Sequence, residues 1–305
     1  MIRCPITYQK LEDGVYSKTG IHYFNPGLKR LRPFPYDNRD QLLKAGAQDR
    51  RLDLNGSKPM IYAQLSIRNA AFVPVDKLGS FILKPRRENI AEQALENEDL
   101  TMKLAAACGI DTPVHGLIYA DDQSRLFTIR RFDRFGKSTI HPATSAAEFS
   151  GKGLQASMDD VLSVIDEHCT FPLVERKKLF HRVLFSFLAG VSDLHPAHIV
   201  ILERNGKKEL SEAFSLKCGI ILSDYPDDEL YIPMNGKKSG FIKEDILIEF
   251  GQKTLGLPEK TIDSVVDQIR HALSEWRRLV RISFLSEENQ KAYLSVLDNR
   301  LERMR

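Results

Sequence analysis

The chain has 305 residues, 42% of them apolar and 28% charged, which suits one large two-lobed domain or two smaller ones. Basic and acidic residues nearly balance, with a net charge of +3. This charge is too small to indicate nucleic-acid binding by itself. No apolar run reaches the roughly 20 residues that a membrane-spanning helix needs, so we expect no membrane partner.

The four cysteines are scattered and form no C-x-x-C pair, which excludes the spacing of a zinc ribbon and is typical of reduced thiols. The first residues contain no apolar segment of the kind found in secretory signals. Both observations predict a cytoplasmic protein.

Prolines and glycines divide residues 1–50 into short pieces, so we expect an irregular lead-in with one short helix over residues 37–48. A strand is predicted over residues 60–67, after a turn that contains Gly56, Ser57 and Lys58. Such a turn can cover phosphate groups with its backbone N–H groups, although a plain hairpin turn explains the same residues.

Two hairpins are predicted next, one from residues 72–75 and 79–85 and one from residues 114–119 and 126–131. A helix over residues 91–107 separates them in the chain, with leucine and methionine at helical spacing. The first hairpin ends at Lys84, a position where a lysine side chain ordinarily lies in water. The second leads into an R-F-D-R sequence, which on its own fits a solvated strand end.

Residues 137–157 are rich in serine, threonine and glycine and predict a loop. Trp276 falls among apolar residues at helical spacing, so we expect it in the core. The remaining helical patterns cover residues 158–169, 174–189, 243–255, 258–281 and 286–304.

One polar loop lies between a buried helical run over residues 183–190 and a β-branched strand over residues 199–202. It contains Asp193, His195 and His198. Because its two ends are anchored, such a loop can hold a catalytic group in place. A turn cap with two ordinary loop histidines explains the same pattern, and the spacing is not that of a helical metal-binding pair.

These motifs resemble, in order and spacing, those of the HipA-like serine/threonine kinases, the toxins of bacterial toxin–antitoxin pairs, and most closely those of the short HipT branch. The resemblance implies an α+β fold, a two-lobed protein-kinase-like (HipA-like) architecture with a small mixed N-lobe and a helical C-lobe. Its expected parts are a lead-in over residues 1–50, an N-lobe over residues 51–134 that ends in the hinge, and a C-lobe over residues 135–305. The motifs that carry it are I-L-K-P at residues 82–85, R-F-D-R at 131–134, C-T-F-P at 169–172, N-G-K-K at 235–238 and the loop at Asp193.

The resemblance also implies roles for single residues. Asp193 matches the catalytic aspartate, and Lys84 matches the lysine that contacts nucleotide phosphates and pairs with a helix carboxylate, here Glu98. Arg131 and Phe132 match the hinge, where the aromatic ring stacks on adenine.

The turn at Gly56, Ser57 and Lys58 aligns with the family's S-x-x-G-V-Q-x-K loop, which covers the nucleotide. The serine of that loop is an autophosphorylation site in the family, and Asp53 replaces it here. An aspartate would supply a permanent negative charge where active relatives carry phosphate, which implies a regulatory role for Asp53.

The sequence departs from the family at both magnesium ligands and at the lysine of the loop. His198 replaces the asparagine, Ser215 replaces the aspartate, and Ala197 replaces the lysine. An imidazole and a neutral hydroxyl are poor magnesium ligands, because magnesium prefers oxygen donors in octahedral geometry. We therefore predict weakened use of ATP and magnesium, and a degenerate kinase (pseudokinase) that acts by protein binding.

The alternative is an active serine/threonine kinase toxin that phosphorylates a translation-related protein through a rebuilt metal site with Asp224, Asp227 or Asp228. A different use of the fold, such as nucleotidyl transfer from a reoriented nucleotide, also stays open. The resemblance implies two partners, a helix-turn-helix antitoxin and a small companion protein that supplies the missing N-terminal subdomain. DNA would be contacted only through the antitoxin.

Overall fold

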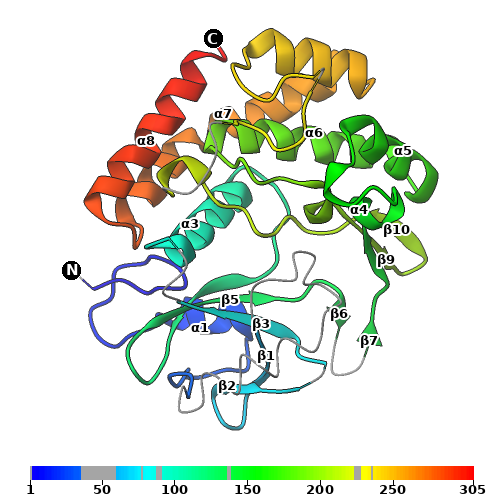
Figure 1. Ribbon diagram of the computed structural model, residues 1–305. Coiled ribbons are helices and arrows are strands. Elements are labelled where there is room, and N and C mark those ends of the chain that lie inside the picture. The colour runs from blue at the N-terminus through cyan, green and yellow to red at the C-terminus, as the bar shows by residue number, and fades with distance from the viewer. Residues whose placement is uncertain are drawn as a thin grey trace. The chain divides into compact units, whose positions relative to one another are not determined.

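The computed structural model divides the chain into two compact units (Figure 1). Unit 1 contains residues 1–99 and 113–140, and unit 2 contains residues 100–112 and 141–305. The chain therefore enters unit 2 for one short segment, returns to unit 1, and then completes unit 2. The structure describes residues 2–35, 60–76, 78–86, 91–135, 139–222, 228–234 and 236–305.

Unit 1 is built on an antiparallel sheet with the strand order β2-β1-β3-β5-β4. The central strand β3 carries Lys84, and the neighbouring strand β5 leads directly into Arg131 and Phe132. The elements of the sheet are β1 (Ile61–Ser66), β2 (Ala71–Pro74), β3 (Phe81–Pro85), β4 (His115–Tyr119) and β5 (Arg125–Arg130); β6 (Arg134–Phe135) and β7 (Thr139–Ile140) form a separate short ladder.

The predicted hairpin between residues 72–75 and 79–85 is wrong, because β1 lies between β2 and β3 and pairs with both. The first half of β1, which contains Ile61, is buried, and a buried apolar strand is more stable inside a sheet than at its edge. The predicted hairpin between residues 114–119 and 126–131 is confirmed by the ladder of β4 and β5.

The lead-in is not irregular throughout, because it contains the helix α1 (Lys18–Phe24). Ser17 caps this helix by accepting a hydrogen bond from Gly20 N at 3.0 Å. Phe24 packs edge-on against Phe72 and Phe81 of the sheet, with ring centroids 5.4 and 6.0 Å away. These contacts join the lead-in to the hydrophobic core of unit 1. The helix predicted over residues 37–48 lies outside the described residues.

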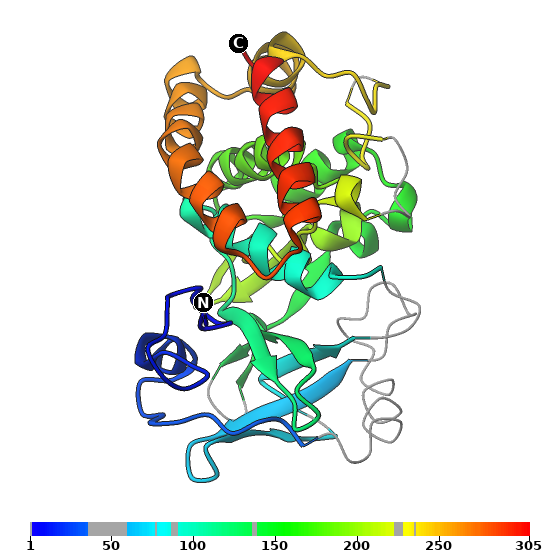
Figure 2. The same cartoon turned by 90° about the vertical axis from the view of Figure 1, so that its left-hand side faces the viewer.

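Unit 2 is mainly helical, and its last two helices run side by side, α7 in orange and α8 in red (Figure 2). The second half of α3 (Ala94–Ala107) belongs to this unit and its first half to unit 1. The other helices are α4 (Ala146–Phe149), α5 (Met158–His168), α6 (Pro172–Ala189), α7 (Glu259–Ile282) and α8 (Glu287–Glu302), with short turns of 3-10 helix at η1 (Gly153–Gln155), η2 (Pro196–His198) and η3 (Gly219–Ile221). A ladder in the order β10-β9-β8 completes the unit, from β8 (Ala143–Ser145), β9 (Val200–Arg204) and β10 (Lys207–Leu210).

The segment over residues 137–157, which we predicted to be a loop, contains the strand β8 and the helix α4. Ser145 and Glu148 form a capping box, in which each side chain bonds to the other's backbone, and α4 begins there. The preceding strand β8 pairs with β9. The helix predicted over residues 243–255 is present as the π-helix η4 (Asp245–Thr254). Its wider turn shows in the bond from Leu255 N to Phe250 O at 2.9 Å.

The predicted core position of Trp276 is confirmed. Its side chain is fully buried, and its Nε1 donates to Leu104 O at 2.8 Å. All four cysteines are buried free thiols. Within the part of the chain that the structure describes, no helix is both long enough and apolar enough to cross a membrane.

The buried His181 of α6 gives unit 2 a pH-dependent stability. Burial, together with the charges of Lys177 and Arg182, lowers the pKa of His181 from 6.5 to about 4. Below pH 6.5 the unfolded chain therefore binds a proton that the folded chain does not accept until about pH 4. The contribution of His181 to stability is complete above pH 6.5 and is lost as the pH falls toward 4.

We predict that the wild type loses about 2–3 kcal/mol more unfolding free energy than His181→Leu when the pH falls from 7 to 4.5. Urea unfolding followed by the fluorescence of Trp276, the single tryptophan, measures both proteins. Equal losses in the two proteins would contradict the assignment of this pH dependence to His181.

Candidate functional site

The lysine and the glutamate that we expected to pair form an ion pair in unit 1. Lys84 Nζ lies 2.6 Å from Glu98 Oε1, and it also lies 5.4 Å from the ring centre of Phe127, which faces Lys84 across the β3–β5 ladder. The Glu98 side chain is 3% exposed and the Lys84 side chain 23% exposed. A buried carboxylate thus orients a partly exposed lysine, which is an arrangement suited to an anionic ligand such as phosphate.

Arg131, which we expected at the nucleotide site, is engaged within unit 1. Its Nε and Nη2 donate to the two carboxylate oxygens of Asp133 at 2.9 and 2.8 Å. Its guanidinium also lies over the ring of Tyr62, 5.1 Å from the ring centre. These contacts hold the turn after β5 in which Phe132 is half-buried. Nucleotide binding by Arg131 and adenine stacking by Phe132 stay predictions.

Part of the predicted site lies outside the described residues. This applies to the nucleotide-covering turn with Gly56, Ser57 and Lys58, to Asp53, and to Asp224 and Asp227. Asp228 is described, and its Oδ2 lies 3.1 Å from Lys238 Nζ. The roles expected for all of these residues stay predictions.

The loop around Asp193 is held at both ends in unit 2. Gly190 ends α6 with φ at 69°, in the left-handed region, and a Cβ there would approach Cys218 Sγ to 3.0 Å. At the other end, His198 closes a turn of 3-10 helix by donating its backbone N–H to His195 O at 2.8 Å. His195 N donates in turn to Asp193 O at 2.8 Å. The backbone of the loop is therefore fixed by its own hydrogen bonds.

The two imidazoles of the loop pack on each other. The His195 and His198 rings are stacked with centroids 3.7 Å apart and an angle of 25° between their planes. His198 Nδ1 lies 3.0 Å from Asp193 O, and because a carbonyl oxygen only accepts, Nδ1 is the donor. Both histidines are buried, at 5% and 8% exposed, and Phe214 packs edge-on against His198. The His198 ring therefore braces the loop internally.

A second segment of unit 2, around Ser215, reaches the same loop. Lys217 Nζ lies 3.6 Å from Asp193 Oδ2, with the two side chains 12% and 17% exposed. Gly219 N donates to Gly190 O at 2.8 Å. Ser215 itself has φ at 58°, a left-handed conformation that is uncommon outside glycine. Asp193 therefore has a lysine neighbour, Lys217, although Ala197 stands where the related kinases carry the lysine of the loop.

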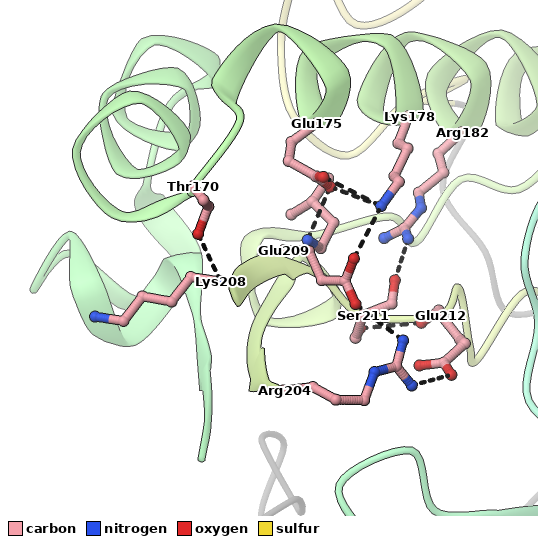
Figure 3. Close-up of polar contacts among 10 residues, drawn as sticks. Thr170, Glu175, Lys178, Arg182, Arg204, Lys208, Glu209, Ser211 and Glu212 are labelled. Carbon is pink, nitrogen blue, oxygen red and sulfur yellow. Dashed lines mark hydrogen bonds and ion pairs between the residues drawn. The ribbon is translucent and has the colours of Figure 1, made fainter. Parts of the chain in front are cut away.

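A charged network, buried at Glu175 and Arg182, fixes β10 and the residues after it to α6 (Figure 3). Arg182 donates to Ser211 O, and Glu175 Oε2 accepts from Leu210 N at 2.9 Å. Burial lowers the pKa of Arg182 to about 10, against the opposing charges of nearby carboxylates, so Arg182 stays protonated at neutral pH. The network continues in ion pairs of 2.9 to 3.8 Å among Glu175, Lys178, Arg204, Glu209 and Glu212.

This network supports the segment that carries Ser215 and Lys217. The backbone of Ser211 is held twice, since its N–H also donates to Val200 O of β9 at 2.8 Å. Four residues later the chain reaches Ser215. The charged face of α6 therefore determines where the segment departs toward Asp193.

The donor set of the loop does not fit magnesium. The two positions expected to bind the metal hold a braced imidazole, His198, and a hydroxyl, Ser215, while the Asp193 carboxylate faces Lys217. Magnesium needs several oxygen donors in near-octahedral geometry. The described residues contain no group of three or more histidine, cysteine, aspartate or glutamate side chains that could hold a metal ion.

Three residues of this region were not predicted. Glu175 and Arg182 lie seven positions apart in α6 and so share one helix face, but the other charged residues of the helix hide this spacing in the sequence. Lys217 offers no signal in the sequence, because its approach to Asp193 follows from the path of the chain after Ser211.

A family model described as HipA-like C-terminal domain matches residues 52–276. A protein of Haemophilus influenzae named "Putative kinase" is 24% identical over 321 aligned residues, which cover 94% of this chain and 91% of that protein. The family match therefore extends over most of the chain, from the predicted nucleotide-covering turn to α7.

Two solved structures are similar. One is HipA of Shewanella oneidensis MR-1, in a toxin–antitoxin complex with HipB and its operator DNA, with a TM-score of 0.62 and 16% identity over 74% of this chain and 58% of that chain. The other is the Helicobacter pylori proinflammatory kinase CtkA, with a TM-score of 0.55 and 15% identity over 73% of this chain and 86% of that chain. At these identities the similarity establishes the fold, and the predicted α+β, kinase-like fold is confirmed.

Replacing Arg182 by methionine should destabilise unit 2 by about 3–5 kcal/mol, because the buried carboxylates around it lose their compensating charge. Arg182→Lys loses the planar guanidinium but keeps the positive charge. Because the charge is kept, the loss of unfolding free energy should be smaller than in Arg182→Met. Urea unfolding followed by Trp276 fluorescence measures both variants. Limited proteolysis should show faster cleavage after residue 207 in Arg182→Met. A loss below about 1 kcal/mol, within the usual range of surface substitutions, would show that the network contributes little.

Proposed function

This chain belongs to the HipA-like C-terminal domain family, and from that premise we propose that it is a degenerate kinase which acts by binding proteins and not by magnesium-dependent phosphoryl transfer. The observation that carries the proposal is the pair of residues at the expected metal positions, His198 and Ser215. Phosphoryl transfer in kinase folds rests on positioning and on neutralisation of phosphate charge by metal ions. A loop without magnesium donors loses the second of these contributions.

The geometry of the loop supports the proposal beyond the identity of the two residues. His198 donates through Nδ1 to the backbone of the loop and is stacked on His195, so the imidazole stabilises the loop itself. Lys217 contributes a positive charge beside Asp193, where a metal site would need negative charge. These contacts are made by protein groups alone, which supports a loop that does not rely on magnesium.

We propose as partners a helix-turn-helix antitoxin and a small companion protein that supplies an N-terminal subdomain, as expected for the HipT branch. The Shewanella HipA occurs in a complex with HipB and operator DNA, which supports a partner of the first kind. DNA would then be reached only through the antitoxin. The complex would form in the cytoplasm.

The second candidate is an active serine/threonine kinase that phosphorylates a translation-related protein. The observation that favours it is the ion pair of Lys84 and Glu98, which leaves the phosphate-binding lysine oriented. Asp193 also keeps its place in a rigid loop. This candidate needs oxygen donors from elsewhere, and Asp224, Asp227 and Asp228 are the residues we assign to it.

We predict weak or no magnesium-dependent binding of ATP by the wild type in isothermal titration calorimetry. The double variant His198→Asn and Ser215→Asp restores two oxygen donors and should raise the affinity in magnesium but not in EDTA. Ser215→Ala is the matched control and should leave the wild-type behaviour unchanged. Micromolar, magnesium-dependent affinity in the wild type would overturn the proposal, and an unaffected double variant would show that these positions are not the metal ligands.

Incubation with labelled ATP and magnesium or manganese separates the two candidates, and the first predicts no phosphate incorporation. If transfer does occur, Asp193→Asn should reduce its rate by about 10²–10⁴-fold, because a general base orients the attacking hydroxyl and accepts its proton. Circular dichroism of the variant checks that the fold is retained. Transfer that persists at more than about a tenth of the wild-type rate, far above the range for loss of a general base, would place the chemistry elsewhere.

A further inference from the structure

Asp99 is a fully buried carboxylate in the first half of α3, directly after Glu98. Successive residues on a helix point about 100° apart, so Asp99 faces a different side of α3 from the side on which Glu98 meets Lys84. A buried carboxylate is costly unless hydrogen bonds or opposite charges compensate it. The contacts of Asp99 therefore constrain the rotation of the helix that carries Glu98.

One of these contacts comes from the N-terminal lead-in. Tyr8 Oη donates to Asp99 Oδ2 at 2.7 Å, and Tyr8 is itself fully buried. Burial, reinforced by the charge of Asp99, raises the pKa of Tyr8 well above its ordinary value, so the phenol keeps its proton and remains a donor. On the other carboxylate oxygen, His115 Nε2 of β4 lies 4.0 Å from Oδ1.

The backbone holds Tyr8 in an uncommon conformation. Its φ is 60°, in the left-handed region, which is strained for a residue with a bulky side chain. The turn is fastened by bonds from Tyr8 N to Cys4 O at 2.8 Å and from Arg3 Nη1 to Tyr8 O at 3.1 Å. Strain of this kind persists only where the surroundings fix it, and here its effect is to direct the phenol at Asp99.

The start of α3 is also held from the sheet. Glu96 Oε1 lies 2.8 Å from Arg125 Nε of β5. Glu96 and Asp99 are three residues apart and so lie on the same side of α3, where the sheet holds one and the lead-in holds the other. Glu98 lies between these two attachment points in the chain.

We propose that Tyr8 is a positioning residue that sets α3 through Asp99 so that Glu98 meets Lys84. When the Tyr8 hydroxyl is absent, Asp99 loses a hydrogen bond inside unit 1, and the start of α3 rotates or loosens to give the carboxylate another partner. That movement withdraws Glu98 from Lys84 and releases the lysine amine. The inference concerns the ion pair alone, so it holds whether or not the site binds nucleotide.

The experiment compares the reactivity of Lys84 in the full chain, with no nucleotide present. Each protein is treated with a limiting amount of acetic anhydride, and acylation is measured lysine by lysine by mass spectrometry. Glu98→Gln removes the partner directly and gives the upper limit of the rate. Tyr8→Phe, which keeps the ring, should raise the rate of Lys84 acylation several-fold toward that limit and should increase amide hydrogen exchange over residues 95–99.

Tyr16→Phe is the matched control, because Tyr16 Oη makes its hydrogen bond to β4 of the same unit, where it accepts from Tyr119 N at 2.7 Å. It should leave Lys84 at the wild-type rate. In an Asp99→Ala background, Tyr8→Phe should add no further increase, since its effect runs through Asp99.

The proposal is overturned if Lys84 in Tyr8→Phe reacts at the wild-type rate, or if Tyr16→Phe accelerates it equally. It is also overturned if Tyr8→Phe raises the rate of Lys84 acylation in the Asp99→Ala background as much as it does in the wild type. Since none of these measurements involves ATP or magnesium, their outcome is separate from the outcome for the proposed function.

Discussion

A charge that leaves water must meet an opposite charge or a hydrogen bond, and this requirement determines the positions of the residues that matter in both units. In unit 1 it joins Lys84 to Glu98 and Tyr8 to Asp99. In unit 2 it joins Arg182 to the backbone of Ser211 and to the charges of Glu175, Asp111 and Glu212. Breaking any of these contacts would leave a buried polar group uncompensated, so the contacts restrict each unit to one arrangement.

The same requirement explains how protein groups alone hold the loop at Asp193, where His198 stands at one of the two positions expected to bind metal. An aspartate in place of Ser215 would add a second carboxylate to this region, and a cation would be needed to balance its charge. Here the balance comes from protein groups, because Lys217 lies beside Asp193 and the His198 ring bonds to the loop backbone. A loop that is complete without an ion has no need of one, which is the physical basis for proposing a binding protein.

The sequence predicted those parts of the fold that depend on local patterns or on spacing within one motif. The strand at Lys84, the helix at Glu98, the long helices of unit 2 and the buried position of Trp276 were predicted in this way, while the ion pair of Lys84 and Glu98 was expected from the family resemblance. Pairing order was not predictable from local pattern, since β1 separates β2 from β3 although the chain connects β2 to β3 directly. The approach of Lys217 to Asp193 and of Tyr8 to Asp99 depends on contacts between distant parts of the chain, which periodicity does not encode.

The most direct test of the account is whether the wild-type protein binds a metal–nucleotide complex at all. The longitudinal relaxation rate of water protons in a solution of Mn²⁺ and ATP rises when the complex binds to a slowly tumbling protein. The account predicts that adding the wild-type protein leaves this rate at the value seen with an unrelated protein of similar size. A saturable rise at micromolar protein concentration would contradict it, because it would show that the protein holds the metal–nucleotide complex although His198 and Ser215 occupy the expected metal positions.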